Sequence, residues 1–226
     1  MGTASLVLFG LFAGLTASVQ LGWWRPLDAG VIAPVAADSP CALLRAGWLL
    51  SPLFSGEVSV VIAAAVAAVV YWRTRRWAAA WLVVGLLATA PLELVGKQVV
   101  QQPIPKATPP VSGIGRPDCG KESYPLTQVT TPFSYPSGSV TRLVYFGTLA
   151  GAAAWRLQRG RVPALTLLIL VIAVGAATRV IIRWHWPSDV LGAFLLGGAC
   201  ACAALWLLRG LAGLPSGSVR SRLPVG

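Results

Sequence analysis

Long apolar runs alternate with short basic clusters along most of this chain. Six runs are long enough to predict membrane-spanning helices, because a helix needs about 20 apolar residues to cross the hydrocarbon core of a bilayer. We expect the spans at residues 4–22, 56–72, 77–97, 137–155, 163–182 and 187–208. The predicted fold class is therefore all-α, a polytopic membrane protein with six transmembrane helices in one bundle.

Two polar segments and a tail separate or follow these runs. Residues 25–53 carry prolines and aspartates between Pro26 and Pro40, which are typical of a loop, while Ala42–Leu50 could form a short interfacial helix. Residues 98–135 hold too many prolines for a span. Residues 209–226 form a polar tail after the last apolar run. We expect residues 25–53 and 98–135 to be the two large loops of a single domain, residues 1–208.

The composition supports a membrane protein and argues against a nucleic-acid partner. The chain is 56% hydrophobic and 11% charged, whereas soluble domains carry roughly 25% charged residues. Its net charge of +11 would suit nucleic acid, but the cations sit in short clusters between apolar runs. That pattern is typical of membrane topology. The expected partners are membrane lipids, and the oligomeric state is left open.

The basic clusters also orient the predicted bundle. Clusters at 73–76, 156–161 and 209–222 all fall on one side if the spans alternate, and positive charge favours the cytoplasmic side. Both termini are then cytoplasmic in a plasma or inner membrane, and the two large loops face outward. Cys41 and Cys119 would share an oxidising space in which they could form a disulfide; the alternative is two free loop thiols.

The stretch from Thr178 to Asp189 draws attention because it holds the only histidine of the chain, His185, between two apolar runs. Ionisable residues at a membrane edge are candidates for a functional site. The alternative is a basic hairpin that binds lipid headgroups.

Two further pieces converge with this stretch on the outer face of the predicted bundle. Lys97 ends the third span, and Pro136–Ser139 open the fourth. Backbone N–H groups at a helix N-terminus favour a phosphate, and Lys97 and Arg179 would add charge-assisted hydrogen bonds. An imidazole with a carboxylate four residues later can be oriented as a nucleophile or base. Together these residues indicate an anion site with reactive chemistry.

These motifs resemble those of the membrane-bound type-2 phosphatidic acid phosphatase superfamily of lipid phosphate phosphatases. Its pattern is K-x6-R-P, then P-S-G-H, then S-R-x5-H-x3-D, in the order and topology found over residues 77–208. The resemblance implies that His185 attacks phosphorus to give a phosphohistidine and that Asp189 orients it. The phosphoryl oxygens would be held by Lys97, Ser137, Gly138, Ser139 and Arg179.

The chain departs from that pattern at two positions. Ile104 replaces the arginine of the first motif, and Ser139 replaces the histidine of the second, which is the general acid of the family. Arg142 and Arg183 could compensate for the lost arginine, or both could be interface anchors. Glu93, one turn before Lys97, could replace the acid or simply form an ion pair with Lys97.

The absence of the family's general acid limits which leaving groups the site can expel, and therefore which substrates suit it. A general acid contributes about 10²–10⁴-fold, and an alkoxide leaving group, the conjugate base of an acid as weak as water, needs that help. A phosphate leaving group with a pKa of about 6 needs far less, so a polyprenyl diphosphate suits this site better than phosphatidic acid.

Three functions follow from the sequence. The first is an outward-facing lipid phosphatase or phosphotransferase. The alternative is a catalytically impaired relative that binds, senses or helps move a phosphorylated lipid, and a channel or transporter without this site is a distant third. We expect no cofactor and no metal, because one histidine and scattered carboxylates do not form a ligand set.

Overall fold

Helices make up most of the described chain in the computed structural model, which describes residues 2–74, 80–105, 132–156 and 159–211. Within these ranges there is no strand, although an isolated antiparallel β-bridge joins Pro103 to Phe133. The elements in order are α1 (Gly2–Gln20), α2 (Arg25–Asp38), α3 (Cys41–Leu50), the 3-10 turn η1 (Ser51–Phe54), α4 (Gly56–Thr74), α5 (Ala80–Val100), α6 (Gly138–Ala154), α7 (Arg161–Ile181) and α8 (Pro187–Leu211).

Helices occupy all six positions at which spans were expected. Four of them are long and apolar enough to cross a membrane: α1, α5, α7 and the part of α8 up to Leu208. The apolar part of α4 is the shorter stretch Gly56–Val69, and α6 has only 17 residues. The protein is therefore a multi-pass membrane protein that is helical throughout the described ranges apart from its connecting segments, while a total of six spans stays a prediction.

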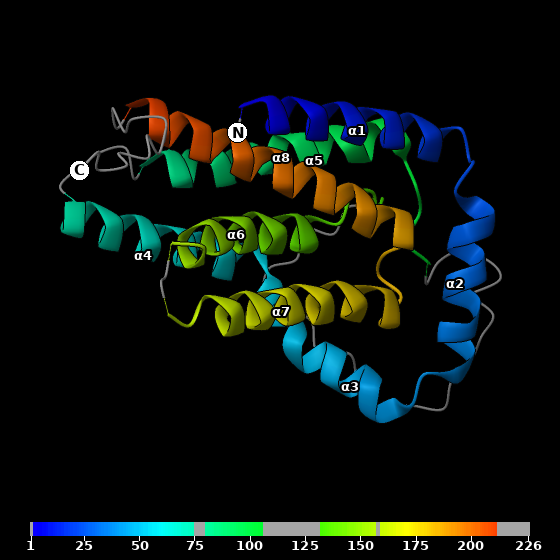
Figure 1. The fold of residues 1–226 in the computed structure, drawn as a ribbon. Coiled ribbons are helices and arrows are strands. Elements are labelled where there is room, and N and C mark those ends of the chain that lie inside the picture. Colours follow the sequence, from blue (N-terminus) through cyan, green and yellow to red (C-terminus); the bar gives the residue numbers. More distant parts are fainter. Residues whose placement is uncertain (1, 75–79, 106–131, 157–158, 212–226) are drawn as a thin grey trace, which may run out of the picture.

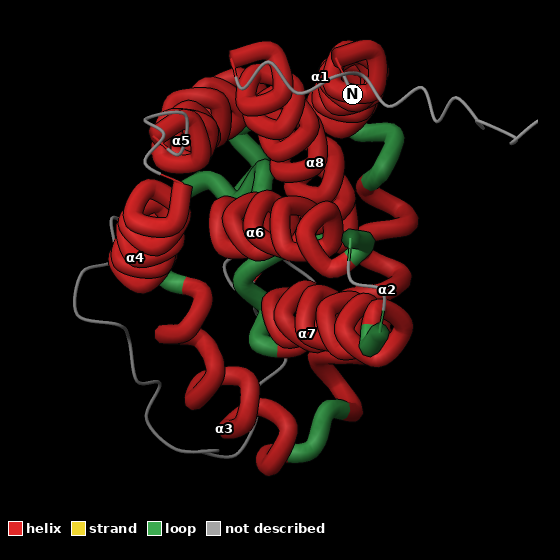
Figure 2. Tube along the Cα trace, turned by 60° about the vertical axis from the view of Figure 1, so that its left-hand side comes forward, coloured by secondary structure: helices red, strands yellow, loops and turns green. Residues whose placement is uncertain are grey.

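Helix α8 lies between α1 and α5 and packs against both and against α6 (Figure 2). Half of its apolar window is buried, against about a fifth in the other long helices. A Cβ at Gly197 would collide with the carbonyl oxygen of Thr141 and lie 3.1 Å from the Cβ of Val144. Small residues of this kind let membrane helices approach closely, so glycine at 197 allows α6 and α8 to pack tightly.

The outer faces of the bundle are apolar, as expected where lipid tails are the solvent. Leu6 of α1 is 73% exposed and Leu167 of α7 is 64% exposed. Polar groups turn inward instead, since the hydroxyl of Ser5 donates a 2.9 Å hydrogen bond to the carbonyl oxygen of Ala199 in α8. This distribution is that of helices packed together within a membrane.

Helix α2 lies across one end of the bundle (Figure 1). The expectation of a loop over residues 25–38 was wrong, because Pro26 sits in the first turn of α2, where its missing N–H breaks no hydrogen bond, and Pro34 is accommodated inside the helix. The short helix expected at Ala42–Leu50 is present as α3.

The end crossed by α2 brings together the C-terminal ends of α1, α5 and α7 and the N-terminal ends of α6 and α8 (Figure 1). The beginning of α1 and the end of α8 lie at the opposite end of the bundle. The three sequence motifs therefore meet at one end of the molecule.

Candidate active site

His185 lies in a tight turn between α7 and α8. Helix α7 ends in a Schellman motif: the N–H of Trp184 donates to the oxygen of Arg179 at 3.1 Å, and that of Arg183 donates to Val180 at 2.9 Å. Arg183 has a φ of 60°, the left-handed conformation that this motif requires. The backbone of Arg183 thus reverses the chain, and the N–H of His185 follows with a 3.3 Å bond to the oxygen of Arg179.

The imidazole of His185 is held through its Nδ1 atom. Nδ1 lies 3.0 Å from the carbonyl oxygen of Ser134 and 3.4 Å from Oδ2 of Asp189. A carbonyl oxygen can only accept, so Nδ1 carries the proton and Nε2 holds the lone pair. Burial lowers the pKa of His185, and the charges of Lys97 and Arg179 lower it further, while Asp189 partly offsets both. The site therefore favours a neutral imidazole with Nε2 available as a nucleophile.

Asp189 is fixed by the start of α8. Its Oδ2 accepts the backbone N–H of Trp186 at 2.8 Å, which is half of a capping box, with the carboxylate reaching back to the residue before the helix. Its backbone oxygen accepts the N–H of Ser137 at 3.1 Å. The same residue thus caps α8, contacts His185 and ties the start of α6 to the start of α8.

The first turn of α6 carries the predicted phosphate-binding residues. Ser137 is the residue before the helix and is fully buried, and its hydroxyl has no hydrogen-bond partner in the part of the chain that the structure describes. The carboxylate of Glu93 packs directly against Gly138, where a Cβ would collide with it. Ser139 is partly buried on the same turn. The N-terminal end of α6 thus faces the carboxyl group of Glu93.

Two cations flank that carboxylate. Nζ of Lys97 lies 3.6 Å from Oε1 of Glu93 and donates a 2.9 Å hydrogen bond to the oxygen of Phe133. Nη1 of Arg142 lies 3.4 Å from Oε2 of Glu93. Glu93 therefore pairs with Lys97, as one of the two expectations had it, and with Arg142 as well.

Arg179 is held separately, on the α3 side of the site. It is 3% exposed, and its two terminal nitrogens donate to Ser51, to the hydroxyl at 2.8 Å and to the backbone oxygen at 3.1 Å. Thr178 replaces the serine of the third motif, and its hydroxyl donates a hydrogen bond to the backbone oxygen of Gly175 within α7. These bonds fix the guanidinium before any ligand binds.

Several expected residues are placed elsewhere. Arg183 acts through its backbone, and no described hydrogen bond or ion pair joins its side chain to the site. Ile104 follows the β-bridge at Pro103 and offers no charge. Cys41 begins α3, whereas Cys119 lies outside the described residues, so a disulfide between them stays a prediction.

Asp28 is a part of this region that the sequence analysis missed. Its carboxylate on α2 accepts the N–H of Ser188 at 2.9 Å, the hydroxyl of Ser188 at 2.6 Å and the side-chain amide of Gln102 at 3.2 Å. Burial raises the pKa of Asp28. The only local signal was an aspartate two residues after a proline, which loops and first helical turns share.

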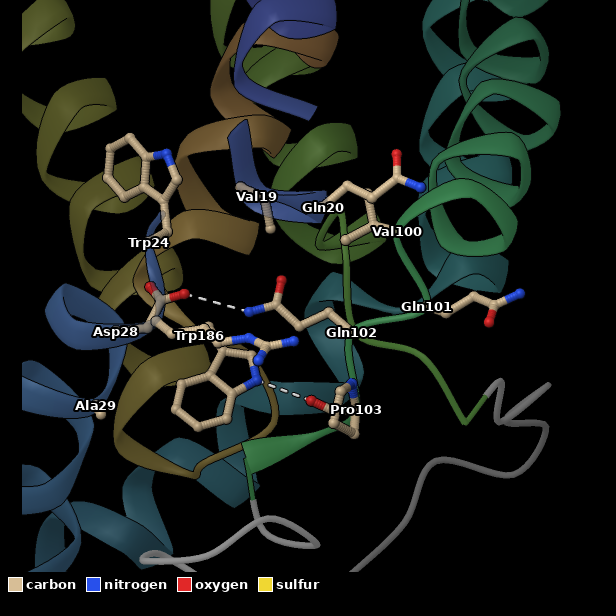
Figure 3. A pocket seen from close by; sticks show the side chains of 11 residues that line it. Val19, Gln20, Trp24, Asp28, Ala29, Val100, Gln101, Gln102, Pro103 and Trp186 are labelled. Carbon is tan, nitrogen blue, oxygen red and sulfur yellow. Dashed lines mark hydrogen bonds between the residues drawn. The ribbon is translucent and has the colours of Figure 1, made fainter. Parts of the chain in front are cut away.

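A pocket of about 340 Å³ lies beside this network, between the ends of α1, α2 and α5 (Figure 3). Arg25 and Trp24 line it together with Trp186. Trp186 donates a 2.8 Å hydrogen bond to the oxygen of Pro103, and this bond and that between Gln102 and Asp28 are dashed in Figure 3. The bond of Trp186 links the wall of the pocket to the turn that carries His185, and the bond of Gln102 links the segment after α5 to α2.

Fold and site together define a multi-pass membrane protein with a buried histidine–aspartate pair next to a cation cluster at helix ends. The chain belongs to the PAP2 superfamily, whose family model matches residues 78–211. The match covers all three motifs and the helices α5 to α8 that carry them.

Known proteins resemble the chain in sequence and in fold. It is 32% identical over 88 residues to phosphatidylglycerophosphatase B of Escherichia coli and of Shigella flexneri, which covers 38% of this chain. The chain aligns with about a third of the length of these relatives, 33%. The crystal structure of a transmembrane PAP2 type phosphatidylglycerolphosphate phosphatase from Bacillus subtilis has the same fold, with a TM-score of 0.70, 16% identity, and coverage of 92% of this chain and 96% of that one.

Proposed function

We propose that this protein is a lipid phosphatase or phosphotransferase that works through a phosphohistidine on His185. The observation that carries the proposal is the hydrogen bond from Nδ1 of His185 to the oxygen of Ser134. That bond fixes the tautomer in which Nε2 is the nucleophile. Membership of the PAP2 superfamily supports the same chemistry.

The reaction would proceed in two steps. Nε2 attacks phosphorus, the bond from phosphorus to the leaving oxygen breaks, and Asp189 stabilises the positive charge that develops on the imidazole. Water or another acceptor then attacks the phosphohistidine, and the bond from nitrogen to phosphorus breaks. Lys97, Arg179 and the first turn of α6 would hold the phosphoryl oxygens, because catalysis of phosphoryl transfer rests on positioning and charge.

The substrate would be a lipid phosphate or diphosphate, such as a polyprenyl diphosphate. Position 139 lacks the histidine of the family pattern, and a diphosphate leaves without strong help from an acid. The relatives are named phosphatidylglycerophosphatases, and a phosphatidylglycerol phosphate is a phosphomonoester of a glycerolipid. Both substrates belong in the assay.

We propose that the site opens on the extracytoplasmic side of the membrane. Arg156, Arg159 and Arg161 lie where α6 ends and α7 begins, at the end of the bundle opposite the motifs, and basic clusters favour the cytoplasm. The lipid would present its phosphate at the end crossed by α2.

The test is the release of orthophosphate by the purified protein in detergent, with a polyprenyl diphosphate and with a phosphatidylglycerol phosphate. Replacing the nucleophile, His185→Ala, should lower the rate by more than about 10³-fold, as for other nucleophile deletions. Arg156→Gln, an exposed arginine at the opposite end of the bundle, is the control and should retain activity. Undiminished release by the His185→Ala variant would refute the proposal, and lipid phosphate binding without any turnover by the wild type would favour the non-catalytic alternative.

A further inference from the structure

The placement of Glu93 addresses the acid that position 139 lacks. Its carboxylate lies between Lys97 at 3.6 Å and Arg142 at 3.4 Å. It also packs against Gly138, the residue directly before Ser139. The chain thus has a carboxyl group next to the position where the family pattern has its histidine.

Glu93 also lies where a phosphoryl group would seek its ligands. Two cations and the N-terminal end of a helix are the groups that bind phosphate, and here they surround a carboxylate. An incoming phosphate would compete for Lys97 and Arg142. Its negative charge would displace the carboxylate of Glu93 from the two cations, because adjacent anions repel each other.

We infer that Glu93 is the proton donor to the leaving oxygen, in the role that the histidine of the second motif fills elsewhere in the family. The inference rests on the proposed function and identifies the group that completes its chemistry. It also broadens the substrate class to alkyl phosphomonoesters, whose leaving groups need a proton.

The proton balance closes over one turnover. Nε2 of His185 bonds to phosphorus while the bond to the leaving oxygen breaks, and the proton of the Glu93 carboxyl passes to that oxygen to give an alcohol. Glu93, now a carboxylate, accepts a proton from the attacking water. The bond from Nε2 to phosphorus then breaks, and orthophosphate leaves.

The other acidic groups near the site already form hydrogen bonds or contacts with other residues. The carboxylate of Asp189 contacts His185 and caps α8, and that of Asp28 is taken by Ser188 and Gln102. The hydroxyl of Tyr135 bonds to Thr16, and burial raises the pKa of Tyr135 to about 12. Glu93 is the described carboxyl group that touches both Lys97 and the first turn of α6.

The experiment compares two leaving groups in a Glu93→Gln variant. Gln keeps the size and a hydrogen-bonding oxygen but cannot donate an acid proton. With an alkyl phosphomonoester, phosphatidic acid, the rate should fall about 10²–10⁴-fold, the usual contribution of a general acid. With p-nitrophenyl phosphate, whose leaving group departs unprotonated, it should change by only a few fold. A purely structural ion pair would instead affect both substrates equally.

Two further variants sharpen the test. Glu57→Gln replaces an exposed glutamate on α4 and should leave both rates unchanged. Ser139→His, added to Glu93→Gln, should restore most of the alkyl ester rate by supplying another acid.

Equal effects on both substrates, or no effect on either, would overturn the role of Glu93. His185→Ala should abolish both activities whichever group donates the proton. Full activity of the His185→Ala variant would therefore overturn the proposed function itself. The two outcomes are distinguishable in one set of assays.

Discussion

Asp189 serves the fold and the proposed chemistry with one carboxylate. The oxygen that caps α8 through Trp186 is also the one that faces His185. A cap holds the carboxylate in one geometry, and the cost of ordering it belongs to folding rather than to catalysis. The spacing of four residues between His185 and Asp189 therefore has a structural cause as well as a chemical one.

The lowered pKa of His185 predicts how activity depends on pH. The neutral imidazole is the nucleophile, so protonation should reduce kcat/KM on the acid side, and a lowered pKa moves that limb below the ordinary value of about 6.5. Replacing Asp189 by Asn removes the group that raises the pKa of His185. The limb should then move to still lower pH while the maximum rate falls.

The measurement is kcat/KM for p-nitrophenyl phosphate across the acid range, for the wild type and Asp189→Asn. A wild-type limb above pH 6.5, or an upward shift in the variant, would contradict the assignment of the nucleophile.

The motif residues and Asp28 show which parts of the site the sequence could predict. Lys97, His185 and Asp189 are recognisable because their spacing repeats a family pattern on single helices and turns. Asp28 contacts Ser188 across 160 residues of sequence, and no local pattern encodes such a contact. The position of Glu93 against Gly138 likewise depends on how α5 packs on α6.

At the scale of elements, hydrophobic runs predicted the helices that lie in the bundle but not α2. The signals for α1, α5, α7 and α8 are long and uniform, so their existence follows from length alone. Pro26 and Pro34 were read as breaks, although a proline in a first turn favours a helix. Packing stabilises α2 as a helix, since its Ile32 is fully buried against Trp186 and Val180.

The contact between α6 and α8 gives a stability prediction. Gly197→Ala places a Cβ against the carbonyl oxygen of Thr141, which must force the helices apart and should cost about 1–3 kcal/mol, as for other overpacked sites. Gly198→Ala is the matched control, because its Cβ would make an ordinary contact with Leu8 at 3.5 Å.

Thermal unfolding of both variants in the same detergent measures the difference. A lower midpoint for Gly197→Ala alone is expected. Equal midpoints for the two variants would mean that α6 and α8 are less closely packed than this structure has them.

At the scale of the whole molecule, the helices run alternately in opposite directions. Helices α1, α5 and α7 run toward the end crossed by α2, and α4, α6 and α8 run back (Figure 1). The turns with the site motifs thus share one end of the bundle. Arg156, Arg159 and Arg161 follow α6 or begin α7 at the other end.

This arrangement predicts which end faces the cytoplasm. We expect the arginine-bearing end to be cytoplasmic because of the asymmetry of basic residues, and the end with His185 to face outward. Single cysteines at Gln101, an exposed residue at the site end, and at Arg156, an exposed residue at the other end, report the two sides. They would be introduced after replacing the native cysteines by serine.

A membrane-impermeant maleimide applied to intact cells should label Gln101→Cys and leave Arg156→Cys unlabelled until the membrane is permeabilised. The reverse pattern would place the site in the cytoplasm and remove the oxidising environment that a disulfide between Cys41 and Cys119 requires. Labelling of both positions in intact cells would contradict a bundle that spans the membrane with these two ends on opposite sides. The expected pattern requires the lipid phosphate to reach His185 from the outer leaflet, because a charged headgroup does not cross the hydrocarbon core unaided.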